Sequence, residues 1–450
     1  MKSEVPSAAD AELNPHGLMR PGIGSLAFLI VMLSASGLTM ARMALVAGLL
    51  PTSDFARYAT IAASGAFLAT IISFGAVEQT IKGFPRLVEE GLGHLMRARC
   101  VEIFRLLTTR TVLLSLPFFI VGEATGIGWL SDLAISGVYA LVTAGMALVA
   151  SMQRAMSDSR KLAAGTLLRT AVVFGCVALA ATSSGLGLVL ATELIATAVV
   201  CLFSVWWFVP VARAPLGVSE YADSLDPPAT GGVAVFLAFS AINVPFYLDR
   251  VYVSAVFGGE VAGRYAVLAL FLTAASLVVN TLAQRIGPDA IRLVKREGSA
   301  RSATRHLVTW IGLCAAFWTV GIAIAAFLFD RPEIPEAIAR YAIEPRMLAP
   351  IALSGILLNT ALLEFLLIAL DREKALLQAA LGFLAATMVV ALAIALSGAG
   401  LETLMWAMAA SRLLYALLLI AALRLSLSAD RRTEDAQQGT HPAGRRSTSR

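Results

Sequence analysis

The chain carries little charge: Asp, Glu, Lys and Arg make up only 14% of its 450 residues, against about a quarter in a typical soluble domain. Hydrophobic residues make up 58% of the sequence. No compact shape of this length could bury so much apolar surface, which excludes a water-soluble globular protein. Most of that surface must instead face lipid.

Residues that carry chemistry are also scarce. The four cysteines are scattered without metal-ligand spacing, and the four histidines lie near the ends of apolar runs or in the tails. Gly231-Gly232 and Gly258-Gly259 lack the Lys-Ser/Thr of a phosphate-binding loop, which argues against an ATP-driven pump. We therefore expect no metal, no cofactor and no enzymatic activity. Without a basic stripe interleaved with aromatics, nucleic-acid binding is not expected either.

Apolar runs of membrane length are abundant. A spanning helix needs about 20 apolar residues, and these runs lack the alternation of a β-barrel strand. We therefore predict an all-α polytopic membrane protein with twelve transmembrane helices. The predicted spans are 24–50, 57–78, 106–122, 132–153, 162–182, 186–209, 232–258, 263–285, 306–329, 347–370, 374–397 and 402–425.

Lysine and arginine are distributed unevenly between the loops. Most of those outside the spans fall in loops that share a side with the N-terminus, which predicts that both termini are cytoplasmic. The two longest loops on that side, 79–105 and 286–305, are expected to carry amphipathic helices at the lipid headgroups. On the opposite side, a surface helix is predicted around 336–341.

One pattern occurs twice, about 207 residues apart. Arg42 precedes an Arg-Tyr-Ala motif at 57–59, and Arg250 precedes the same motif at 264–266. Duplicated halves with charges inside membrane-length helices are typical of transporters. Six helices in each half would keep both lobes the same way up and would create a cleft between them.

The repeat predicts five segments. The first segment is too polar for a signal peptide, and the third is rich in proline, which is typical of a linker. The segments are a polar N-terminal segment 1–23, an N-lobe 24–209, an inter-lobe linker 210–231, a C-lobe 232–425 and a disordered cytoplasmic tail 426–450.

Seven charged residues lie deep inside the predicted spans, where each costs about 2.5–3.5 kcal/mol to insert. The candidates are Arg42, Arg250, Arg412 and Arg169 for binding an anionic head group, and Glu364, Asp249 and Glu193 for coupling to H⁺ or Na⁺. The alternatives stay open. The arginines could reach the headgroups or pair within the bundle, and each acid could be the ion-pair partner of an arginine.

The repeated motifs resemble a known family. Residues 48–59, with Pro51 and Ala56, are similar to the first-helix signature of bacterial polysaccharide flippases, Gly-Pro-x-x-(Asp/Glu)-Phe-Gly-x-Tyr. Asp249-Arg250 with 258–266 is similar to the seventh-helix signature, and the Asp-Arg-Glu-Lys turn at 371–374 is similar as well. The family belongs to the superfamily of multidrug, oligosaccharidyl-lipid and polysaccharide (MOP) exporters.

The resemblance implies two six-helix lobes around a central cleft, alternating access, and a glycan substrate joined through pyrophosphate to a polyprenyl lipid. The expected function is flipping of that lipid-linked oligosaccharide across the bacterial inner membrane for O-antigen or exopolysaccharide assembly. Arg42 and Arg250 lie in the matching motifs, whereas Arg169 and Arg412 are candidates by their depth alone. Membrane lipid, the lipid-linked glycan and glycosyltransferases or a polymerase are the expected partners. An ion-coupled multidrug or metabolite antiporter, or a non-transporting scaffold, are the alternatives.

Overall fold

The structure, a computed structural model, describes residues 23–77, 80, 84, 87, 95–155, 159–183, 185–208, 232–297, 300–329, 336–370 and 372–439. The predicted linker 210–231 and all but the last residue of the predicted segment 1–23 lie outside the described residues. Every regular element in the described part of the chain is helical.

Twelve spans in the described residues are long and apolar enough to cross a membrane, which confirms the predicted all-α multi-pass architecture. Those of the first half are α1 (Ile23–Leu49), α2 (Thr52–Ser73), α4 (Leu95–Thr125), α5 (Gly128–Ala155), α6 (Ser159–Ser183) and α7 (Leu186–Phe208). The third begins well before the predicted 106 because Leu95, Cys100 and Ile103 continue its buried stripe.

The second half contains broken spans. Its elements are α9 (Gly232–Tyr247), α10 (Asp249–Phe257), α11 (Gly259–Glu297), α12 (Ala300–Phe329), α13 (Glu336–Ala339), α14 (Leu348–Leu358), α15 (Leu362–Ala369), α16 (Glu373–Ser397) and α17 (Leu401–Gly439). Span seven breaks at Leu248, three residues after Pro245, where a helix loses one amide donor. Span ten is interrupted by a short 3₁₀ turn between α14 and α15.

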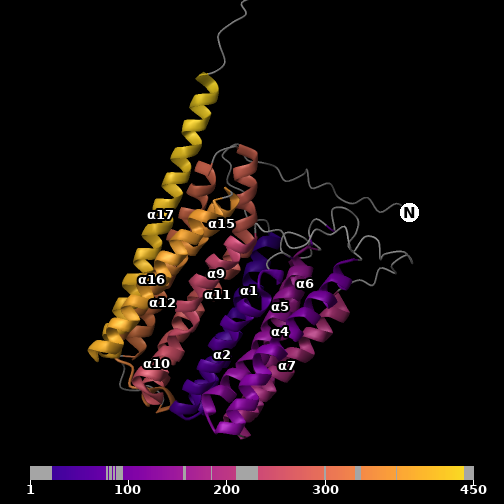
Figure 1. Cartoon of the computed structure of the whole chain (residues 1–450), viewed down its shortest axis with the longest axis vertical. Helices are drawn as coiled ribbons and strands as arrows, with labels where there is room; N and C mark the ends of the chain where they lie inside the picture. The colour runs from indigo at the N-terminus through magenta and orange to yellow at the C-terminus, as the bar shows by residue number, and fades with distance from the viewer. Residues whose placement is uncertain are drawn as a thin grey trace, which may run out of the picture.

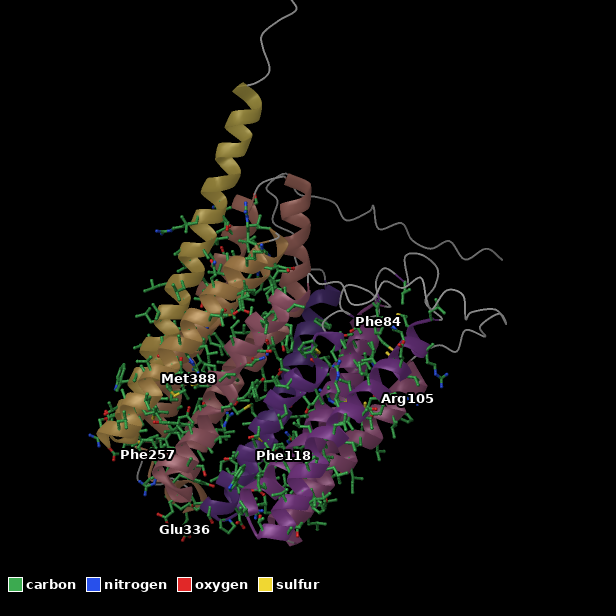
Figure 2. All side chains as sticks on the ribbon, viewed as in Figure 1. Phe84, Arg105, Phe118, Phe257, Glu336 and Met388 are labelled. Atoms are coloured by element: carbon green, nitrogen blue, oxygen red, sulfur yellow. The ribbon has the colours of Figure 1, made fainter. Side chains whose placement is uncertain are left out.

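The two halves form two groups of helices side by side (Figure 1), joined where α1 and α2 pack against α11. Ala266 and Leu270 of α11 belong to one buried cluster with Val46 and Phe55 from the first half. Around the bundle, side chains built mainly of carbon point outward (Figure 2). Many of the exposed residues are large and apolar, and Leu113 of α4 is 71% exposed. This surface suits contact with lipid chains.

Three local predictions have clear outcomes. The predicted surface helix near 336–341 is present as α13, one turn long. In 286–305 no separate surface helix lies among the described residues, because α11 and α12 simply extend into it. The predicted disordered tail 426–450 is wrong for its first part, since α17 continues to Gly439 and projects beyond the bundle (Figure 1). Residues 426–439 include good helix formers and no proline, which explains this extension. The side of the membrane on which the termini lie stays a prediction.

Candidate functional site

In the first half, a buried carboxylate gathers side chains from four helices. Glu193 of α7 is 2% exposed and accepts hydrogen bonds from Nη1 of Arg42 at 2.5 Å and from the Tyr58 hydroxyl at 2.5 Å. The Tyr139 hydroxyl donates to the same carboxylate. Since α1, α2, α5 and α7 each supply one member, the N-lobe cluster ties these helices together. Three donors compensate the desolvated charge of the carboxylate.

This geometry selects between the alternatives left open by the sequence. Arg42 pairs within the bundle, and Glu193 is its ion-pair partner. The Nε atom of Arg42 is buried and has no hydrogen-bond partner among the described residues. The guanidinium is therefore bound through Nη1, and its Nε–H is left as a donor for a further ligand.

The second half has a related cluster at the helix break. Asp249, the first residue of α10, accepts the backbone N–H of Arg250 at 2.7 Å and the Tyr265 hydroxyl at 2.5 Å. The Arg250 Nη1 atom lies 3.9 Å from the same carboxylate, and Nη2 donates to the Thr273 hydroxyl at 3.0 Å. An aspartate suits this place because a new helix start exposes backbone N–H groups. The C-lobe cluster is thus built mainly on α10 and α11.

The repeated tyrosine links the two clusters. Tyr58 and Tyr265 come from the duplicated Arg-Tyr-Ala motif, and each donates to a buried carboxylate. The carboxylate itself comes from α7 in one lobe and from α10 in the other. Sequence reasoning assigned these tyrosines no role, although the repeat already marked them. Tyr139 carried no such signal.

Arg412 and Arg169 each line a small cavity, one in each lobe. Arg412 on α17 lies over the Phe246 ring at 5.6 Å and lines a small cavity with Tyr265 and Ser354. Arg169 on α6 lines a second cavity with Gln153 and Ser204. Each cavity has room for about one water molecule. Each of these two cavities lies within its own lobe, whereas the sequence led us to expect a cleft between the lobes.

Glu364 stands apart from these clusters. It lies in the first turn of α15, the second part of span ten, and is 4% exposed. The Tyr415 hydroxyl donates to it at 2.9 Å, and no basic side chain in the described part of the chain pairs with it. A buried carboxylate without a cationic partner inside a membrane span is a candidate for a proton-coupling group.

The lobes are fastened together at the end where α1 ends and α2 begins. The Ala47 carbonyl would normally bond to the N–H of residue 51, but that residue is Pro51 and has none. The hydroxyl of Tyr341 donates to this carbonyl at 2.7 Å, and the Arg340 guanidinium donates to it as well. Burial raises the pKa of the Tyr341 phenol, which keeps the donor proton in place. We call these contacts the clasp.

Apolar packing surrounds the clasp. The Tyr341 side chain is 1% exposed and meets the Phe55 ring edge-on at 6.0 Å between centroids. Nearby, a Cβ atom on Gly263 would lie 2.6 Å from the Thr52 carbonyl oxygen, so glycine is required for α11 to approach α2 this closely. The lobes are in direct contact at this end.

The structure therefore brings together Arg42 with Glu193 and Arg250 with Asp249, and it places Arg42 and Arg250 in separate clusters. Arg169 lies close enough to Arg42, and Arg412 to Arg250, for their charges to interact. The ligand-binding and ion-coupling roles of these residues stay predictions.

No protein-family model matches the chain, and no curated protein matches it in sequence. Solved structures do. A MOP superfamily transporter from Pyrococcus furiosus Vc1 (DSM3638), described as having a binding pocket of reverse polarity, is 15% identical with a TM-score of 0.63 over 90% of this chain and 96% of its own. An inward-facing multidrug resistance MATE family transporter is 12% identical, with a TM-score of 0.57 over 92% and 99%.

A MATE family transporter in its outward-facing conformation gives a TM-score of 0.55 at 12% identity, over 91% of this chain and 96% of its own. At such low identities the likeness concerns the fold. The chain is a multi-pass membrane protein with the fold of MOP superfamily transporters.

Proposed function

We propose that the protein is an alternating-access transporter that flips a polyprenyl-pyrophosphate-linked oligosaccharide across the bacterial inner membrane for surface polysaccharide assembly. The fold supports transport, because the solved structures that share it are transporters. The substrate class is argued from charge.

The observation that carries the proposal is the excess of arginine inside the described spans. Each lobe holds two arginines whose charges interact. Arg42 pairs with Glu193 and lies near Arg169, whereas Arg250 and Arg412 both lie near Asp249. Arginine keeps its charge even when buried. A positive interior favours an anionic head group such as pyrophosphate. It disfavours cationic ligands, and many drugs are cations.

Proton- or sodium-coupled antiport of drugs or metabolites is the second candidate, and Glu364 favours it. A buried carboxylate that lacks a basic partner can exchange a proton without disrupting an ion pair. The two candidates differ in what Glu364→Gln should do. Antiport requires the carboxylate, whereas flipping of a lipid-linked anion depends first on the arginines.

Reconstitution tests the proposal. Proteoliposomes containing a fluorescent polyprenyl-pyrophosphate oligosaccharide would be assayed for movement of the glycan between leaflets. Loss of one charge-assisted contact, about 1.5–3 kcal/mol, should slow flipping roughly tenfold to a hundredfold in Arg250→Ala. For the N-lobe, Arg42→Gln combined with Glu193→Gln removes the cation without stranding its partner carboxylate. Arg346→Gln, at a 65% exposed arginine, is the matched control.

Undiminished flipping in both cluster variants would reject the charge argument. Cation-gradient-driven drug efflux by the wild type, lost in Glu364→Gln, would favour antiport. The proposal also names glycosyltransferases or a polymerase of the same pathway as protein partners. Their co-purification with a protein that translocates neither substrate would indicate a scaffold instead.

A further inference from the structure

Arg412 is a buried cation whose hydrogen-bonding capacity is not filled. Its side chain is 8% exposed, although it lies in the middle of a membrane-spanning helix. Its Nη1 atom has no hydrogen-bond partner in the part of the chain that the structure describes. The aromatic face of Phe246, 5.6 Å from the guanidinium carbon, offers only a cation–π contact.

The charges around Arg412 do not balance. Arg412 interacts with Asp249 and with Arg250, but Asp249 already accepts the Tyr265 hydroxyl and the Arg250 backbone. Two guanidinium groups therefore share one carboxylate. Because arginine does not give up its proton, the excess charge needs a counter-ion from outside the chain.

A space for such an ion lies beside the guanidinium. Arg412 lines a cavity with Tyr265, Ser354 and Met408, and the cavity has room for about one water molecule. A chloride ion is only slightly larger than water and binds well where N–H and O–H donors meet apolar groups. Pyrophosphate and carboxylate ligands are several times too large. The size of the space thus selects a small monovalent anion.

We propose that the C-lobe binds a chloride ion in this cavity, held by Nη1 of Arg412 with the Ser354 hydroxyl in its wall. The ion neutralises the charge that Asp249 leaves uncompensated. This site belongs to the interior of one lobe. Because the chloride ion would occupy Arg412, binding of the lipid-linked substrate proposed above would then depend on Arg42 and Arg250.

The N-lobe also has an arginine beside a small cavity. There Arg169 faces a space of similar size, lined also by Gln153 and Ser204, and its charge interacts with that of Arg42. Arg42 is already paired with Glu193, so the second arginine is again the one without a carboxylate among the described residues. The recurrence of an arginine-lined cavity in each lobe supports a common counter-ion.

Two measurements test the site. The thermal unfolding midpoint of the full-length protein would be compared in sodium chloride, bromide and gluconate at equal ionic strength. Chloride and bromide should raise the midpoint relative to gluconate in the wild type and in the control Arg346→Gln. In Arg412→Met, the apparent chloride affinity should fall at least about tenfold. The absolute midpoint is not the criterion, because replacing an unpaired buried charge by methionine can itself stabilise a protein.

A crystal of the wild type soaked in bromide gives the direct answer. An anomalous peak beside Nη1 of Arg412 would support the proposal, even if the variant failed to fold. A chloride response unchanged in Arg412→Met would overturn it. So would a cavity that holds only water in the presence of bromide. Ser354→Val, which fills the cavity but keeps the arginine, should also weaken the halide response.

Discussion

The clasp predicts how removal of a single oxygen atom shifts the balance between closed and open lobes. Tyr341→Phe keeps the ring that packs against Phe55 but deletes the hydroxyl that donates to the Ala47 carbonyl. Pro51 cannot replace the lost donor, so only Arg340 still bonds to that carbonyl. The net contribution of such a hydrogen bond is about 1 kcal/mol, which corresponds to roughly a fivefold change in the ratio of closed to open molecules.

Removal of both donors should have a larger effect. In Arg340→Ala with Tyr341→Phe, a buried carbonyl has no donor in the closed state but can bind water once the lobes separate. The unsatisfied group adds about 1–3 kcal/mol, enough to make the open state dominant if the lobes are nearly balanced. The effect of the double variant should therefore exceed twice that of the single one.

Distances between spin labels would measure this shift. Labels at Trp129 and Glu336 are exposed and lie on different lobes at the clasp end. Three of the four native cysteines are buried, which limits background labelling. Tyr252→Phe is the matched control, because its hydroxyl donates to the Ala391 carbonyl at 2.6 Å within the C-lobe. Identical distance distributions in the wild type, Tyr341→Phe and the double variant would refute the clasp.

Three further predictions concern the clusters and the lobe contact. Glu193→Gln leaves Arg42 buried without an anion and should lower the free energy of unfolding by about 3–5 kcal/mol, seen as a lower thermal midpoint; an unchanged midpoint would mean that the ion pair is dispensable. Gly263→Val should separate α11 from α2 and destabilise the protein by about 1–3 kcal/mol. The same spin-label assay should then show a looser clasp end. Gly312→Ala is the control and should have neither effect, because the added Cβ atom meets nothing within 4 Å. Glu364→Gln should leave stability nearly unchanged, because an amide still accepts the Tyr415 hydroxyl; a large loss would indicate an ionised partner.

Membrane architecture was predictable from sequence because it depends on local apolar length. The twelve spans and the one-turn helix at 336–339 needed only composition and spacing. The continuation of α17 to Gly439 was missed because polar composition was interpreted as disorder, although its residues favour helix.

The contacts of the site were less predictable. The pairing of Arg42 with Glu193 was one of the alternatives that the sequence left open. Selecting it required the orientation of α1 relative to α7, which only the structure gives. The clasp lay beyond sequence reasoning, since Tyr341 and Ala47 are 294 residues apart. The sequence shows that Pro51 leaves the Ala47 carbonyl without its helical donor. No residue near Pro51 in the sequence indicates which side chain donates instead.

The carboxylate that accepts the repeated tyrosine lies in a different setting in each lobe, and this difference affects which lobe can rearrange. In the N-lobe cluster, Glu193 binds partners from three other helices, so moving any one of these helices breaks a buried charge contact. In the C-lobe cluster, Asp249 and Arg250 are neighbours on α10, beside a break that follows Pro245. Rotation of α10 carries both charges together and preserves their contact. Such a rotation would break two hydrogen bonds to α11, whereas displacing α7 would break contacts of Glu193 with three helices. We therefore expect the α9–α10 break to move more easily than the N-lobe cluster.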